Sequence, residues 1–269
     1  MFLLFLVAKH FLFSANQLGE TCYVNCVLQC LAHTLPLRKY FLTQSNVNHD
    51  VLDHSKSSAF HELMTAMWND DGEILDTNHF IHVHKFENKL QDADQSYDKL
   101  SEFLTGNEVA NGIKTIFTEN IEFLQYDGIK HIPANRLMVY LPLEKEIVFS
   151  PLKNLIVNNR TMKISQFGHA PNILVILLGR NHGEDDNGYI NRTNVIATFD
   201  VDNMSWEIED KKVSYSCYAV INHEDKDGLH YTTVARNGKD GKWFKYDDVA
   251  VKEVTEDSVV SLENYMLFF

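Results

Sequence analysis

The chain has 269 residues, of which 45% are hydrophobic and 23% are charged, and its formal net charge at pH 7 is −13. This composition is typical of an ordinary soluble globular protein, and the length allows one large domain or two modest ones. The acidic balance argues against nucleic acid as a main partner, since phosphate contacts need a basic face, and it suits a basic partner instead.

Residues 1–13 (MFLLFLVAKHFLF) form an apolar segment interrupted by Lys9 and His10. The segment is too short to span a bilayer, and it lacks the leading positive charge and clean cleavage site of a signal peptide. We therefore expect no stable membrane insertion. A first strand or an apolar leader packed on the domain is the preferred interpretation.

Residues 17–31 (QLGETCYVNCVLQCL) predict a turn at Gly19 that leads into an apolar helix, with Cys22 on the first helical turn. Thr21 is a good N-cap, so Cys22 would lie where unpaired backbone N–H groups and the positive end of the helix dipole converge. This environment favours a nucleophilic thiolate. A free cysteine can equally be a small buried residue, and spacing alone leaves both interpretations open.

Three of the four cysteines, Cys22, Cys26 and Cys30, recur every fourth residue, and the fourth is Cys217. A disulfide along a regular helix is geometrically poor, so the spacing predicts reduced thiols and an intracellular compartment. A metal site is an alternative, but the pattern lacks the paired CxxC knuckles of structural zinc.

The first hundred residues are predicted to be mostly helical. After the helix that begins at Cys22, a turn at 34–36 precedes a short helix over 37–42, and apolar periodicity predicts helices over 57–68 and 86–104. Between the last two, His79, His82 and His84 alternate with apolar residues. No acidic or cysteine cluster completes a metal site there, so we expect a solvated face.

From about residue 110 the pattern changes to short β-rich runs with Gly, Asn and Asp at the turns. Residues 181–188 predict an exposed loop. Helices followed by strands predict an α+β fold with an antiparallel sheet. The predicted strands are 114–117, 121–125, 137–141, 173–178, 194–198, 215–220, 230–236, 242–247 and 265–269.

A histidine that activates a thiol also needs a group that fixes its tautomer. His230 begins a predicted hairpin whose tight loop is 237–241, and a hairpin centre at 238–239 sets residue 230 opposite 247 or 248. An imidazole and a carboxylate would then lie side by side. Asp247 and Asp248 would point to opposite faces of the strand, and the sequence alone does not decide between them.

The residues around Cys22 resemble the cysteine box of the ubiquitin-specific proteases, papain-like thiol proteases that cleave ubiquitin from its conjugates. Further similar segments are the helix start at 90–95, the strand at 171–180 and the His230-Tyr231 to Asp247-Asp248 region. The cysteine box reads Leu18-Gly19-x-Thr21-Cys22-Tyr23-x-Asn25-x-x-Leu28-Gln29-Cys30-Leu31.

This resemblance implies site residues. Cys22 is the expected nucleophile, His230 the base and Asp247 its orienting acid, with Asp248 in a secondary role near the oxyanion. The family's oxyanion-hole Asn is replaced here by Gln17, which carries the same amide on a longer stem. The family's Gly before the catalytic His is replaced by Leu229, which could narrow the substrate channel.

The resemblance also implies a single catalytic domain over 1–269, with a helical thumb over about 14–105 and fingers and palm over about 106–269. The paired CxxC motifs that bind zinc in many members are absent between residues 105 and 215, so we expect no metal and no cofactor. The similarity is greatest to members without that zinc site, such as the herpesvirus-associated ubiquitin-specific protease.

The resemblance therefore implies a cysteine-type deubiquitinase whose partners are ubiquitin and ubiquitinated proteins, in the cytoplasm or nucleus. Two alternatives follow from the departures at Gln17 and Leu229 and from the family's range. One is a weak or inactive ubiquitin-binding pseudoenzyme, and the other is a protease for a ubiquitin-like modifier. An adaptor that uses its acidic face remains if both boxes are coincidental.

Overall fold

The structure is a computed structural model, and it describes residues 11–12, 21–43, 54–69, 75–87, 89, 91–105, 124–127, 130–133, 138–143, 149–152, 172–184, 190–192, 196–208, 211–224 and 230–269. Several sequence predictions lie outside these residues. They are the site residue Gln17, Leu229, the strand at 114–117 and most of the strand at 121–125. Of the apolar segment 1–13, the two described residues form β1 (Phe11–Leu12), which pairs with β2 (Leu75–Asp76).

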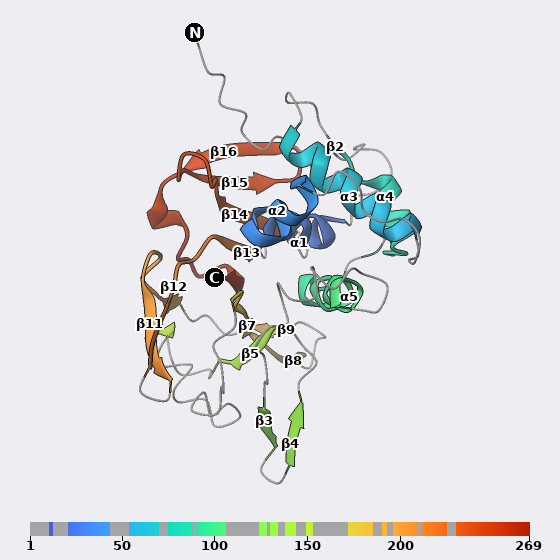
Figure 1. The fold of residues 1–269 in the computed structure, drawn as a ribbon. Helices are drawn as coiled ribbons and strands as arrows, with labels where there is room; N and C mark the ends of the chain where they lie inside the picture. Colours follow the sequence, from blue (N-terminus) through green and yellow to red (C-terminus); the bar gives the residue numbers. More distant parts are fainter. Residues whose placement is uncertain are drawn as a thin grey trace.

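The five helices α1 to α5 all precede residue 106, in agreement with the prediction of a mostly helical first part. In Figure 1, α3, α4 and α5 lie to the right, with β2 beside α3, and α1 and α2 lie in the centre next to β13 and β14. None of the described helices is long and apolar enough to cross a membrane. The helices are α1 (Cys22–His33), α2 (Leu35–Thr43), α3 (His54–Asn69), α4 (Asn78–Val83) and α5 (Ala93–Thr105).

The main sheet has seven strands in the order β16-β15-β14-β13-β17-β7-β5. Every neighbouring pair is antiparallel except β5 and β7, which are parallel. The predicted α+β fold is therefore confirmed. The strands are β5 (Val139–Pro142), β7 (Val175–Gly179), β13 (Ala219–Glu224), β14 (His230–Arg236), β15 (Trp243–Asp247), β16 (Ala250–Val254) and β17 (Asn264–Phe268).

Smaller two-stranded pairs lie outside this sheet, and the β3–β4 hairpin extends away from the helices (Figure 1). The loop predicted over 181–188 is wrong in its first half, because Asn181–Glu184 pair with a later strand. The remaining elements are β3 (Leu124–Asp127), β4 (Lys130–Pro133), β6 (Phe149–Pro151), β8 (Asn181–Glu184), β9 (Ile190–Arg192), β10 (Ile196–Thr198), β11 (Met204–Ile208), β12 (Lys211–Tyr215) and a 3-10 turn (Glu256–Ser258).

Helix α1 is buried along its whole length and packs across β13 and β14. Side chains alternate along the strands, so β7 turns Val175 and Leu177 toward the helices and Ile176 and Leu178 into a second core on the far face. The Thr233 hydroxyl of β14 donates to the Cys26 carbonyl of α1 over 3.2 Å. These contacts fix the N-terminal end of α1 against the sheet.

The helix predicted over 86–104 begins only at Ala93. Lys85 has φ of 56°, a left-handed conformation that ends the preceding turn, and the Phe86 N–H donates to the Ile81 carbonyl. Phe86 itself is buried against Phe80. Its apolar character thus reflects the closing of α4 and not the start of α5.

The solvated face predicted for the three histidines is wrong for His84, although His79 and His82 are exposed. The His84 ring is buried, with its centroid 4.2 Å from that of Phe80 in a stacked arrangement, and its Nε2 lies 3.2 Å from the Lys56 carbonyl. His84 is therefore a core residue that packs against aromatic rings.

Candidate active site

Cys22 is the first residue of α1 and is 7% exposed. The carbonyl of Thr21 accepts from the Val24 and Asn25 backbone N–H groups, and the Asn25 side-chain amide donates to the same oxygen over 2.7 Å. The helix therefore starts at the predicted position. The predicted cap by the Thr21 side chain is not formed.

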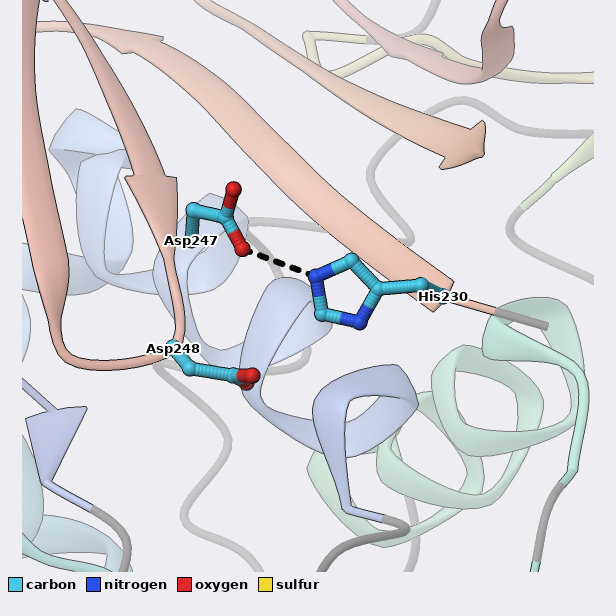
Figure 2. A group of neighbouring side chains, drawn as sticks. All are labelled: His230, Asp247 and Asp248. Atoms are coloured by element: carbon cyan, nitrogen blue, oxygen red, sulfur yellow. Dashed lines mark hydrogen bonds and ion pairs between the residues drawn. The ribbon is translucent and has the colours of Figure 1, made fainter. Parts of the chain in front are cut away.

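His230 opens β14 and Asp247 closes β15. The Nε2 atom of His230 lies 2.8 Å from Oδ1 of Asp247, and Figure 2 shows the ring directed at this carboxylate. The predicted pairing of these two residues by local hairpin structure is thus present, although the register differs. Thr233 pairs with Tyr246, and extending this ladder by one residue sets Thr232 opposite Asp247. His230 therefore contacts Asp247 diagonally across the two strands.

Asp248 does not turn away from this pair as predicted. It has φ of 48° in the two-residue connection between β15 and β16, and this left-handed backbone directs its carboxylate back toward the ring (Figure 2). Burial raises the pKa of Asp248, nearby His230 lowers it, and Asp247 raises it. All three groups lie within 4.8 Å of one another.

The pKa of His230 is raised to about 9. The largest cause is a hydrogen bond with the Cys22 side chain; burial opposes the rise, and the hydrogen bond to Asp247 adds to it. The raised pKa favours the protonated ring, and the Cys22 side chain contributes most to the rise. An imidazolium beside a cysteine is the arrangement that activates a thiol nucleophile.

The other cysteines lack such a neighbour. All four are free, and burial raises the pKa of Cys26, Cys30 and Cys217 above the usual value for a thiol. Burial keeps these three protonated, so they act as small core residues. Of the four cysteines, Cys22 is the one in contact with an ionisable base.

Within the described part of the chain, His230, Asp247 and Asp248 are the one group spaced as metal ligands. A metal-bound imidazole must offer a lone pair, whereas His230 uses Nε2 for Asp247 and has a pKa of about 9. The group therefore fits acid–base chemistry better than cation binding.

Three polar residues beside Asp247 were not predicted as part of the site: Lys245, Glu224 and Thr232. Lys245 Nζ lies 2.6 Å from Oε1 of Glu224 and 3.6 Å from Oδ2 of Asp247, the oxygen not used by His230. The Thr232 hydroxyl donates to the same Glu224 oxygen over 2.9 Å. Burial opposes the charge of Lys245, but the bond to Glu224 raises its pKa. Since Lys245 and Asp247 are two residues apart on a strand, their shared face was a usable signal.

The sequence profile described as "Ubiquitin carboxyl-terminal hydrolase" matches residues 14–269. The chain belongs to this family. Curated relatives include human ubiquitin carboxyl-terminal hydrolase 43, 45% identical over 56 residues that cover 20% of this chain and 5% of that protein. Another is the Schizosaccharomyces pombe "Probable ubiquitin carboxyl-terminal hydrolase 1", 32% identical over 114 residues, 37% of this chain and 13% of that protein. The matches thus span a small part of these relatives.

Solved structures share the fold of this ubiquitin carboxyl-terminal hydrolase chain. A chain of the Ubp8–Sgf11–Sgf73–Sus1 SAGA DUB module has a TM-score of 0.70 at 16% identity, with 97% of this chain and 66% of that chain covered. An essential yeast splicing factor also gives a TM-score of 0.70, at 15% identity, with 97% and 68% covered. The predicted family and fold class are therefore confirmed.

Proposed function

We propose that the protein is a thiol-dependent deubiquitinase that hydrolyses the bond after the C-terminal glycine of ubiquitin. The observation that carries this proposal is the meeting of Cys22, His230 and Asp247 from opposite ends of the chain. Family membership supports it, as do fold relatives described as bound to ubiquitin aldehyde and to monoubiquitin.

In the proposed reaction, Cys22 Sγ attacks the carbonyl carbon after the terminal glycine, and the leaving amine takes a proton from His230. A thioester and a free amine result. His230 then removes a proton from water, the hydroxide attacks the thioester, and the carboxylate and the Cys22 thiol are released. Asp247 holds Nε2 of the ring, which leaves the other nitrogen for the sulfur.

The oxyanion formed in each step needs hydrogen-bond donors. We assign this role to the Gln17 amide and the Cys22 backbone N–H, which lies at the N-terminus of α1 where helix N–H groups are unpaired. Asp248, beside His230, takes a secondary polar role at the same place. Gln17 in place of the family's Asn is the departure with the greatest bearing on rate, since loss of one oxyanion donor typically costs about 10²–10³-fold.

The division into a helical thumb over about 14–105 and fingers and palm over about 106–269 is part of this proposal, with the channel for the Gly-Gly tail between them. We also propose that the protein is most similar to family members without a zinc site, such as the herpesvirus-associated ubiquitin-specific protease, and that it resides in the cytoplasm or nucleus. The sequence supports the zinc-free assignment, because no cysteine lies between Cys30 and Cys217.

The substitutions at Gln17 and Leu229 favour one second candidate, a ubiquitin-binding pseudoenzyme. Hydrolysis of ubiquitin carrying a C-terminal amide-linked fluorophore separates the two. The deubiquitinase releases fluorophore with the wild-type chain and not with Cys22→Ala, whereas the pseudoenzyme binds ubiquitin and releases none. The same substrate built on a ubiquitin-like modifier is the matched comparison, and faster turnover of that substrate would contradict ubiquitin specificity.

A further inference from the structure

A cavity lies far from Cys22, at the other end of α1. It has a volume of about 370 Å³ and is walled by His33 of α1, the first turns of α2, Trp68 of α3 and the loop between β14 and β15. Ligand cavities in proteins measure about 300–1,000 Å³, so this one has room for one or two side chains. Helix α1 has 12 residues, which at about 1.5 Å each separates the two sites by roughly 17 Å.

Arg38 is the principal charge in this cavity. Its guanidinium carbon lies 3.4 Å from the centroid of the Trp68 ring, a cation–π stack. The ion pairs among the described residues do not include Arg38. Burial lowers the pKa of Arg38, which is the cost of a charge partly removed from water without a counter-ion. Its planar fork is thus preformed for a carboxylate.

The neighbouring groups do not neutralise Arg38. Arg236 is paired with Asp202 at 2.5 Å, and burial lowers the pKa of His33 to about 4, so that ring is uncharged at pH 7. No Asp or Glu lines the cavity among the described residues, although the chain holds 37 acidic and 24 basic residues. The cavity is therefore a local positive site on an acidic protein.

Much of the remaining wall is apolar, and Asn237 adds a polar side chain. Ile173, Tyr218 and Phe269 line the cavity beside Arg38, and Leu35 at the start of α2 is 50% exposed. Trp, Tyr and Arg are the residues most enriched where a few side chains carry the energy of protein association. A ligand that fits must present a negative charge next to a large apolar group.

We propose that this cavity is a docking site for a peptide segment of a partner protein in which an acidic residue stands beside Leu, Ile or Phe. The carboxylate binds the Arg38 fork, on the side where the N-terminal turn of α2 adds positive potential. The apolar side chain enters between Ile173 and Phe269. Occupancy leaves Cys22 free, so the site tethers a partner while the proposed reaction proceeds.

Selection of random twelve-residue peptides displayed on phage, with the full chain immobilised, tests the proposal. Enriched peptides are expected to place Asp or Glu within two positions of Leu, Ile or Phe. The best peptide is then synthesised with a fluorescent label and its Kd measured by anisotropy. Failure to enrich acidic–apolar peptides overturns the proposal, and neither result depends on whether Cys22 is catalytic.

Four variants locate the binding. Arg38→Met is expected to weaken the Kd at least tenfold, since a charge-assisted bidentate pair is lost, and a peptide with Glu replaced by Gln should lose as much. Leu35→Glu adds a repelling charge at the exposed rim without disturbing the core, which covers the case of an unfolded Arg38 variant. Leu262→Glu, at another exposed apolar residue, and Lys252→Met, on the exposed strand β16, are matched controls that should change the Kd less than twofold. If both Arg38→Met and Leu35→Glu bind the peptide as tightly as the wild type does, the proposal is contradicted.

Discussion

A histidine lies at each end of α1, and the pKa values of the two are shifted in opposite directions. At the N-terminal end, His230 touches Cys22 and Asp247, and its pKa is raised to about 9. At the C-terminal end, burial lowers the pKa of His33 to about 4, although its Nδ1 donates to the Gln29 carbonyl over 2.8 Å. The His33 ring is flanked by Trp68 and Tyr246 in edge-to-face contacts.

The difference comes from the partners and not from the residue type. His230 is half-buried beside a carboxylate that favours its charged form, whereas His33 is fully enclosed among aromatic rings with Arg38 nearby, which disfavours it. One histidine is thus suited to proton transfer and the other to packing. The following predictions test that contrast.

The largest effect is expected from the histidines themselves. His230→Asn should lower kcat on ubiquitin–fluorophore by about 10³-fold or more, since loss of a base leaves only binding and oxyanion stabilisation. His33→Asn should leave kcat at pH 7.5 within about threefold for the folded fraction. A similar loss in both variants would contradict the assignment.

The next largest effects are expected at the two aspartates, which should differ in how much each contributes to kcat. Asp247→Asn should lower kcat by about 10²–10⁴-fold through loss of tautomer control, and Asp248→Asn by about tenfold. The imidazolium exists below pH 9 and is lost above it, so the alkaline limb of the pH–rate profile should lie near pH 9. In Asp247→Asn this limb should move to lower pH, toward the ordinary histidine pKa of 6.5. If the limb does not move, Asp247 does not act on His230 as proposed.

His33 should make stability depend on pH. Its folded pKa of about 4 lies below the unfolded value of about 6.5, so the unfolded chain binds more protons and stability is lost as pH falls through this window. From pH 7 to pH 5 the free energy of unfolding should fall by about 2 kcal/mol more in the wild type than in His33→Gln. Urea titrations at both pH values measure this difference, and parallel losses would contradict it.

Lys245 should have the smallest effect of the four. Lys245→Met removes the contact to Oδ2 of Asp247 and should lower kcat by about tenfold with KM unchanged, while Lys245→Arg should recover most of it. Lys242 forms an exposed ion pair with Glu253 nearby, so Lys242→Met is the matched control and should change kcat less than twofold. Equal effects of the two substitutions would make Lys245 a surface residue only.

Much of this arrangement was readable from local pattern. β14 begins and ends at the predicted residues, and the helix of Cys22 starts where its turn and periodicity indicate. Side-chain periodicity gave wrong predictions at two places where the backbone conformation determines the structure. Lys85 and Asp248 both adopt positive φ. The first closes the turn after α4, and the predicted helix begins only at Ala93; the second redirects a carboxylate.

The register of the β14–β15 hairpin could also not be predicted from the sequence. Its ladder pairs Thr233 with Tyr246, which is centred between 239 and 240, later than predicted. The loop gives Asn237 and Lys242 a closing hydrogen bond of 2.8 Å, and this geometry depends on backbone turns that several sequences can make. The burial of His33 and His84 likewise follows from distant aromatic residues and not from their own segments.

The proposed nucleophile can be identified directly. The wild-type chain is incubated with ubiquitin that carries a thiol-reactive group at its C-terminus, and the adduct is digested and mapped by mass spectrometry beside Cys22→Ala. We predict a single adduct on the peptide that contains Cys22 and none in the variant. An adduct on Cys26, Cys30 or Cys217, or tight ubiquitin binding without any adduct, would contradict the account.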